Sequence, residues 1–321
     1  MRLVKMLPAL AALCTALSLP AALADEIEVF TLDSALKPTT VTVPENPQRV
    51  AVLDYAVMDI MQGLGLEDRI AASAKGACPS YLTDLVQNDK ILNAGTVKQV
   101  SLERLMEAEP EVIFIGGRLA SQYDKLSEIA PVVQLSVNYE DGTLQSAENF
   151  AKVIGQIFDK EAQADERFAG YKARLEAIKE KAAGKTAMLG LVTAGSFHVL
   201  GDHARLSFIT KAAGFKNLSP DVSATHGADS SFELISKLNP EYIFVLDRDS
   251  AIARPGSKLA QDVMDNDLVN STQAAKEGHI IYINSGVWYL AEGGLQAMDY
   301  MLQDLERALH IQSGAEEQAG Q

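Results

Sequence analysis

The sequence predicts an α/β protein built from two lobes with mainly parallel sheets, joined by one long helix. Three observations support this prediction: strands and helices alternate along the chain, one strand-bearing segment occurs twice, and an uninterrupted helical pattern lies between the two copies. The repeated segment spans residues 101–118 and returns at 231–248, with seven of 18 positions identical. A single repeat at this spacing does not suit a solenoid and indicates two similar lobes.

Residues 1–24 have the layout of a secretory signal peptide. Arg2 and Lys5 precede an apolar run that Pro20 interrupts and that ends in small residues, which fits a signal peptide better than a membrane anchor. No second apolar stretch long enough to span a bilayer follows. We therefore expect cleavage after Ala24, export to the periplasm, and a mature chain without a direct membrane anchor.

The composition limits the possible partners. The mature chain of about 297 residues is long enough for two domains of ordinary size, and Cys78 is its single cysteine, so no internal disulfide can form. Loss of Arg2 and Lys5 takes the formal net charge from −15 to −17. So acidic a chain argues against nucleic acid or anionic lipid as a partner, and an anionic ligand would need a local positive site.

Residues 25–160 form the expected first lobe. Short β-branched runs alternate with helical stretches there, a pattern typical of a parallel sheet. The expected strands are 49–54, 69–74, 111–116 and 132–137, with helices between them such as 56–65 and 143–160.

Residues 161–184 predict the linking helix. The segment has no proline, and Phe168, Tyr171, Leu175 and Ile178 recur along one helical face. About 22 helical residues at ~1.5 Å each span ~33 Å, enough to cross the molecule as a strut. A flexible linker would instead be rich in Gly, Ser or Pro, so we expect the lobes to move little.

Residues 185–311 form the expected second lobe, in which the alternation of strands and helices resumes. The expected elements are strands at 186–194, 196–201, 241–247 and 279–284, and a closing helix at 294–309. The polar tail 312–321 is expected to be disordered.

Loop residues that directly follow predicted strands are the candidates for a binding cleft. Each copy of the repeat ends on an arginine, Arg118 or Arg248, and ligands of open α/β sheets bind at the carboxyl ends of the strands. Arg205 lies between a strand and a helix start, and Lys75 follows another strand. A lone arginine is usually a solvated surface charge, but a guanidinium fork also suits planar, delocalised anions. The repeat position favours an anion site.

His226 and Tyr289 are candidates for metal coordination, because imidazole and phenolate both bind Lewis-acidic metals. Trp288 adjoins Tyr289 at the end of an apolar run, so we expect its side chain to pack in the interior and also count it as a ligand-binding residue beside the cleft. Two residues this far apart are a weak signal without further context.

Other readings of the sequence remain open. A zinc or manganese site could use His198, His203 and His226 with Asp202, although a Gly-Asp turn between the first two does not place them on one helical face. The sequence has no nucleophile-elbow pattern, no phosphate-cradling glycine-rich loop, no His-Glu-x-x-His and no cysteine pair. We therefore expect a protein that is not an enzyme.

Several short motifs, in this order, resemble the periplasmic iron-siderophore-binding proteins of ABC transporters, the class III substrate-binding proteins. The similarity covers the whole mature chain and looks most like the ferric-catecholate branch, which includes enterochelin-uptake and anguibactin-binding proteins. The matching stretches are NPQRVAVLDYAVMDIMQGLG, KGACPSYL, the two Pro-Glu-x-Ile-Phe copies, LDRDSAI and INSGVWYLAEGG. The resemblance implies two α/β lobes joined by one long helix.

The resemblance also implies the site and the partners. The arginines around the catecholate oxygens would be Arg118, Arg205 and Arg248, the residues able to coordinate iron His226 and Tyr289, and Lys75 would line the cleft. Ferric iron would arrive as a siderophore complex, with no intrinsic cofactor, and a monomer would pass it to an inner-membrane ABC permease. Haem or cobalamin is the alternative ligand within this fold, although neutral cobalamin would not need three arginines.

Glu103 and Glu233 share a position in the repeat, near the expected tips of the lobes. They are candidates to dock basic residues of a permease. They equally suit helix N-termini, where a carboxylate close behind a serine cap is stabilising.

Overall fold

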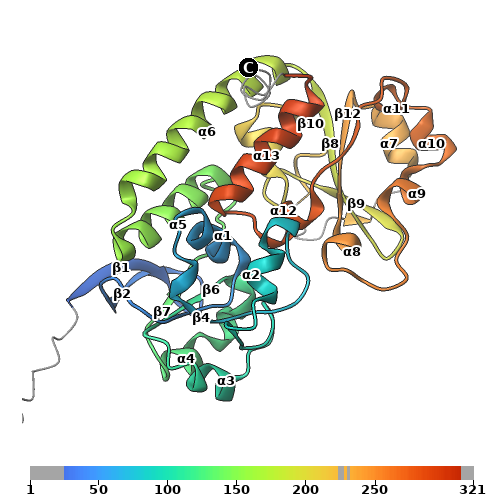
Figure 1. Ribbon diagram of the computed structural model, residues 1–321. Helices are drawn as coiled ribbons and strands as arrows, with labels where there is room; N and C mark the ends of the chain where they lie inside the picture. Colours follow the sequence, from blue (N-terminus) through green and yellow to red (C-terminus); the bar gives the residue numbers. More distant parts are fainter. Residues whose placement is uncertain (1–24, 223–227, 230–231, 312–321) are drawn as a thin grey trace, which may run out of the picture.

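Two β-sheets form the centres of two lobes (Figure 1). The computed structural model describes residues 25–222, 228–229 and 232–311. The sheet of the first lobe is parallel throughout, in the order β5-β4-β3-β6-β7. Its strands are β3 (Val50–Val52), β4 (Ile70–Ser73), β5 (Leu92–Asn93), β6 (Val112–Ile115) and β7 (Val132–Gln134). An antiparallel hairpin of β1 (Glu26–Leu32) and β2 (Pro38–Pro44), which the sequence reading missed, precedes this sheet.

The sheet of the second lobe is mixed. Its order is β11-β9-β8-β12-β13, with β10 also paired to β8. The strands are β8 (Thr186–Thr193), β9 (Ser196–Leu200), β10 (Lys216–Asn217), β11 (Ala228–Asp229), β12 (Tyr242–Asp247) and β13 (Ile280–Tyr282). β9 runs antiparallel to β8 because only Ala194 and Gly195 connect them, and both have positive φ, as a two-residue hairpin turn requires. The remaining pairs along β8 and β12 are parallel, as predicted.

The sheets are covered by helices, many of them short. The first lobe contains α1 (Tyr55–Gly63), α2 (Thr83–Gln87), α3 (Leu102–Glu107), α4 (Tyr123–Ser127) and α5 (Thr143–Phe158), with 3₁₀ turns η1 (Glu67–Arg69), η2 (Ser80–Leu82) and η3 (Gly117–Gln122). The second contains the π-helical η4 (Phe208–Ala212), α7 (Phe232–Leu238), α8 (Arg248–Ala251), α9 (Ala260–Met264), α10 (Asp267–Asn270), α11 (Gln273–Lys276), α12 (Ser285–Leu290) and α13 (Leu295–Ala308).

The long helix α6 (Glu161–Ala182) links the lobes and runs beside α13 along one side of the molecule (Figure 1). Its buried side chains include Phe168, Tyr171, Leu175 and Ile178, so the predicted apolar face is confirmed. The predicted fold class of two α/β lobes joined by one long helix is therefore confirmed.

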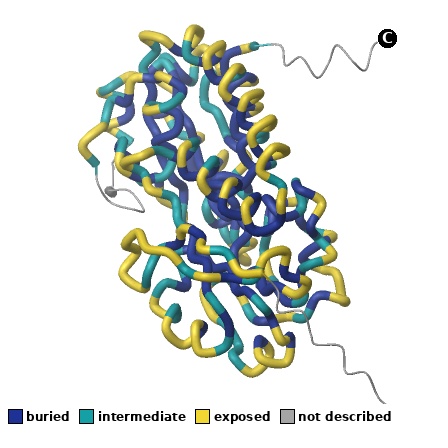
Figure 2. Tube along the Cα trace, turned by 90° about the vertical axis from the view of Figure 1, so that its left-hand side faces the viewer, coloured by how far each residue is buried: buried dark blue, intermediate teal, exposed yellow. Residues whose placement is uncertain are grey.

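The hydrophobic core is shared between the lobes. One continuous cluster of buried side chains includes Met58 of α1, Phe150 of α5, Phe168 of α6 and Leu295 of α13. Separate clusters cover the outer face of each sheet. Figure 2 shows the buried segments running through the interior while exposed segments form the outer surface. Burial of apolar side chains between the lobes favours one fixed arrangement of the two sheets.

A buried carboxylate ties α13 to the first lobe. The Asp59 side chain, on α1, accepts hydrogen bonds from the backbone N–H groups of Gln296 at 2.7 Å and Ala297 at 2.8 Å, and from the Tyr81 hydroxyl. These are N–H groups that a helix leaves without intrahelical partners. Burial raises the pKa of Asp59 to about 7, although the hydrogen bonds act in the opposite direction. Tyr81 also stacks on Tyr300 of α13, with ring centroids 4.9 Å apart.

Candidate functional site

A cavity of about 240 Å³ lies between the lobes. Its first-lobe wall consists of residues that follow β3, β6 and β7 together with Phe150 of α5, and its second-lobe wall comes from the loop after β9 and from α12 and the residues behind it. The polar and charged residues of the lining are Asp54, Arg118, Ser136, Tyr139, Arg205, Tyr289 and Glu292. This is the position where the strand-end argument predicts a cleft.

The three arginines singled out in the sequence surround one phenol ring. The guanidinium carbons of Arg118, Arg205 and Arg248 lie 5.6, 4.6 and 5.7 Å from the centroid of the Tyr289 ring. These distances are within the range of attraction between a cation and the electron-rich face of an aromatic ring. The fold thus brings together residues from η3, the loop after β9, and α8 around a side chain of α12.

Arg118 and Arg205 are held by carbonyl and carboxylate groups of the second lobe. Arg118 comes from the first lobe, and its guanidinium donates to the Tyr289 carbonyl oxygen at 2.7 Å. Arg205 donates from one nitrogen to the Glu292 carboxylate at 3.3 Å and to the Tyr289 carbonyl at 3.4 Å. Its side chain is only 14% exposed. Both guanidiniums are therefore oriented by groups of the protein itself.

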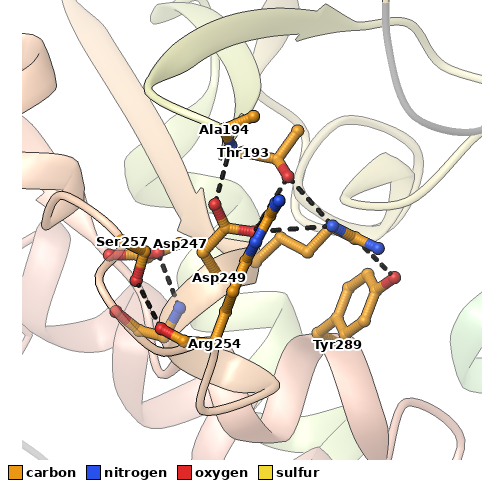
Figure 3. A network of polar contacts seen from close by, with 9 residues as sticks. Thr193, Ala194, Asp247, Asp249, Arg254, Ser257 and Tyr289 are labelled. Atoms are coloured by element: carbon orange, nitrogen blue, oxygen red, sulfur yellow. Dashed lines mark hydrogen bonds and ion pairs between the residues drawn. The ribbon is translucent and has the colours of Figure 1, made fainter.

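Arg248 reaches the phenol oxygen itself. Its Nε donates to the Tyr289 hydroxyl at 2.9 Å, and one of its terminal nitrogens donates to the Thr193 hydroxyl at 2.9 Å. Thr193 in turn donates to the buried Asp249 carboxylate at 3.0 Å (Figure 3). Arg248 is the first residue of α8 and directly follows β12. The end of the strand therefore sets the backbone position from which the Arg248 side chain makes these contacts.

The electrostatic surroundings of two phenols in the cavity differ. Burial alone would raise the pKa of Tyr289, but the hydrogen bond from Arg248 and the charges of the three arginines outweigh it, so its pKa lies below the ordinary value. Burial raises the pKa of Tyr139, and the neighbouring Glu292, to which its hydroxyl donates at 2.9 Å, raises it further. Tyr289 is therefore the phenol suited to act as an anionic ligand, and Tyr139 the one held protonated.

Two buried carboxylates complete the wall of the cavity. Glu292 accepts from Tyr139 and, at 3.0 Å, from the Thr143 hydroxyl, so it connects the two lobes behind Arg205. Asp54 accepts from the backbone of Ala56 at 2.9 Å and caps α1. Burial raises the pKa of each carboxylate, while nearby arginines lower it.

The sequence reading missed Asp54, Ser136, Tyr139 and Glu292 as site residues. Only Asp54 gave a usable signal, because an acidic residue directly behind an apolar strand suits both a helix cap and a strand-end site.

Gly116 packs closely against Asp54: a side-chain carbon at Gly116 would come within 2.2 Å of the Asp54 carboxylate. The position therefore admits only glycine unless Asp54 moves.

Three other predicted site residues fall outside this arrangement. The expected burial of Trp288 is confirmed, but its assignment as a ligand-binding residue is wrong: its indole N–H donates to Asp304 at 2.8 Å, and helix α12 turns it away from the cavity lining. Lys75 does not line the cavity, and its ammonium donates to the Asn88 carbonyl at 2.8 Å. His226 lies outside the described residues.

The alternative zinc or manganese site finds no support in the part of the chain that the structure describes. There, no three His, Cys, Asp or Glu side chains are grouped so that they could hold a metal ion. His203 pairs with Glu140 at 2.9 Å, and Asp202 accepts from the side chains of Thr210 and Asn217.

Within residues 25–222, 228–229 and 232–311, no helix has the length and apolar character needed to cross a membrane.

Comparisons with known proteins agree with this architecture. A family model described as periplasmic binding protein matches residues 50–286. The petrobactin-binding protein YclQ of Bacillus subtilis is 33% identical over 285 residues, which are 88% of this chain and 89% of that protein. The ferric-anguibactin-binding protein FatB of Vibrio anguillarum is 24% identical over 269 residues, covering 82% and 83% of the two chains.

Solved structures give the same picture. The crystal structure of YclQ matches with a TM-score of 0.82 at 31% identity, over 88% of this chain and 99% of that chain. The periplasmic catecholate-siderophore-binding protein VctP of Vibrio cholerae matches with a TM-score of 0.80 at 28% identity, over 88% and 100% of the two chains.

Proposed function

The chain belongs to the periplasmic binding protein family, and from this premise we propose that it captures a ferric siderophore of the catecholate class between its lobes and delivers it to an ABC importer. The resemblance to siderophore-binding proteins seen in the sequence is confirmed by the relatives, which bind petrobactin, ferric anguibactin and catecholate siderophores. These relatives are binding proteins, and the protein is not an enzyme.

The observation that carries the proposal is the cluster of three guanidiniums around Tyr289, of which Arg118 and Arg205 line the interlobe cavity and Arg248 donates to the Tyr289 hydroxyl. A ferric catecholate presents negatively charged oxygens on planar rings. Arg118, Arg205 and Arg248 can each donate charge-assisted hydrogen bonds to such oxygens, and the half-enclosed position limits competition from water. The acidic outer surface interferes little, because salt screens exposed charges beyond ~8 Å at physiological ionic strength.

Tyr289 supplies a direct contact with iron in this proposal. Its lowered pKa favours the phenolate, which is the form that binds a ferric ion. His226 is proposed as a second protein ligand on the strength of the family resemblance. A tetradentate siderophore leaves two of the six positions around iron open, and phenolate and imidazole would complete them. A hexadentate siderophore fills all six, so both side chains could then only pack beside it.

The transport setting follows from the family. Siderophore-binding proteins of ABC systems work outside the cytoplasmic membrane and pass their cargo to a permease. We propose that the signal peptide is removed after Ala24, that the mature protein is a monomer without an anchor, and that it carries no cofactor of its own. Glu103 and Glu233, each in the first turn of its helix, are the proposed contacts with the permease.

The test uses purified mature protein, an iron-loaded catecholate, and haem as comparator. Trp288 is the single tryptophan and directly precedes Tyr289, so a ligand that absorbs in the visible should quench its fluorescence by energy transfer without touching it. Saturable quenching by the ferric catecholate, with the visible colour retained after desalting, is expected. Saturable quenching by haem alone would overturn the assignment of the ligand.

A further inference from the structure

The loop behind Arg248 lines a second, solvent-open cavity of about 480 Å³. Its lining includes Asp249, Arg254 and Lys258 together with Ala194 and Gly195 of the β8–β9 turn. Asp249 lies in contact with Arg248, which in turn contacts Tyr289 in the wall of the interlobe cavity. The second cavity thus adjoins the arginine cluster through a single layer of side chains.

The backbone of the loop brings Arg254 back toward α8. Ala253 adopts a left-handed conformation, with φ of 49°, and the Arg254 N–H donates to the Asp249 carbonyl at 2.9 Å. A residue in this conformation ends a helix by folding the chain back on its last turn. Figure 3 shows the Arg254 side chain rising beside Asp249 toward Thr193. Its place next to the arginine cluster is therefore set by the backbone.

One carboxylate is shared by two guanidiniums. The same oxygen of Asp249 lies 3.5 Å from a terminal nitrogen of Arg248 and 3.4 Å from one of Arg254. Asp249 also accepts shorter hydrogen bonds, from the Ala194 backbone at 2.7 Å and the Thr193 hydroxyl at 3.0 Å. Its strongest bonds therefore hold the β8–β9 turn, and its charge cannot offset both arginines.

The loop consequently keeps an excess of positive charge. Arg248, Arg254 and Lys258 contribute three positive charges, against two negative ones from Asp247 and Asp249. Asp247 is occupied by the backbone N–H groups of two helices, at Ser250 and at Ala260.

The Arg254 guanidinium is available for a further partner. Its side chain is 49% exposed, and its contact with Asp249 at 3.4 Å is long for a hydrogen bond. A guanidinium has five N–H donors, so most of its donor capacity stays open to a ligand group in the adjoining cavity.

We propose that Arg254 forms an outer anionic subsite, which favours iron complexes of higher negative charge, because Glu292 and Asp249 already offset part of the charge of the three inner arginines. This inference rests on the proposed siderophore function and concerns which complexes are preferred. Three doubly deprotonated catecholates around a ferric ion leave two more negative charges than two catecholates do. The cavity lined by Arg254 and Lys258 adjoins Arg248 through Asp249, so a part of the ligand that extends beyond the interlobe cavity on this side would meet these two side chains.

The test compares the affinities of the parent and of Arg254→Gln for a ferric tris-catecholate and a ferric bis-catecholate. We expect Arg254→Gln to weaken the tris-catecholate by about fivefold to tenfold and the bis-catecholate by less than about twofold, since a half-exposed charge is partly screened. Arg254→Lys, which keeps the charge, should retain most of the preference. The control is Arg104→Gln, an arginine 58% exposed with one acidic partner at 3.0 Å, which should change neither affinity.

Different failures separate this inference from the function on which it rests. If the parent binds neither complex, the proposed function fails. If the parent binds both and Arg254→Gln weakens them equally, Arg254 acts through Asp249 on the position of Arg248 and the outer subsite is refuted. Unchanged binding of both complexes would refute it as well.

Discussion

Replacement of Arg248 by alanine tests the link between the sequence repeat and ligand binding. Arg248 ends the second copy of the repeat, and its guanidinium lies between the Tyr289 hydroxyl and Thr193. A ligand oxygen that displaces part of this network gains a charge-assisted hydrogen bond. Loss of that bond should cost about 1–3 kcal/mol, or roughly 5- to 150-fold in Kd for a ferric catecholate.

The structure also predicts that Arg248→Ala leaves the thermal stability nearly unchanged. Thr193 keeps its hydrogen bond to Asp249, and the Tyr289 hydroxyl faces a cavity where water can replace the lost donor. Fluorescence titration gives the affinity, and thermal unfolding gives the stability. An Arg248→Ala protein that binds as tightly as the parent, with a saturable signal in both, would refute the role of the repeat.

The control arginine must be chosen from the structure. Arg174 on α6 looks like a neutral choice in the sequence, but it makes a two-pronged ion pair with Glu306, at 2.7 and 2.8 Å, and a further bond to Asp299 on α13. Its removal would loosen the helix pair and lower stability for reasons unrelated to the ligand. Arg104 has only an exposed neighbour on its own helix, Glu107, and is the matched control.

Three further predictions follow from the site and the chain terminus. Tyr289→Phe and His226→Ala should each weaken a tetradentate ferric bis-catecholate much more than a tris-catecholate, and Tyr289→Phe should remove a visible charge-transfer band; equal losses with an unchanged spectrum would show that neither side chain touches iron. Without added ligand, the pKa of the Tyr289 phenol should lie below that of an ordinary tyrosine, as measured by the ultraviolet difference between the parent and Tyr289→Phe during a pH titration. Arg248→Gln should move this titration to higher pH, because a positive charge that favours the phenolate is lost. Mass spectrometry of exported protein should find Asp25 as the first residue, and a retained leader would contradict cleavage after Ala24.

The elements that the sequence predicted well are those with a strong periodic pattern. Helix α6 has apolar residues at helical spacing along one face, and strands β6 and β12 are apolar runs of strand length rich in β-branched and aromatic residues. The β1–β2 hairpin was missed although both strands alternate polar and apolar residues, as in 26–29 and 40–43. The short helices α8 to α11 depend on caps such as Asp247 and Thr272, which set their start without an apolar pattern.

The candidate site was predictable where a charged side chain directly follows a predicted strand. Arg118 and Arg248 were found because the repeat places both behind strands of the two lobes. Trp288 was misplaced because residues 285–290 form a helix, whose rotation of about 100° per residue sends neighbouring side chains in different directions. Tyr139 and Glu292 could not be paired from sequence, since their contact depends on how the lobes are set against each other.

The fixed positions of the three arginines explain how an acidic protein could bind an anion in its cleft. Arg118, Arg205 and Arg248 are each held by a carbonyl, a carboxylate or a hydroxyl of the protein itself. Fixing such a side chain on binding would otherwise cost ~0.5–1.5 kcal/mol of lost rotamer freedom for each arginine. The shared core and the buried Asp59 contact with α13 hold the two walls of the cavity in register, so the ligand need not assemble the site. Affinity then depends on local geometry within the cleft, and the net charge of −15 on the whole chain bears on solubility instead.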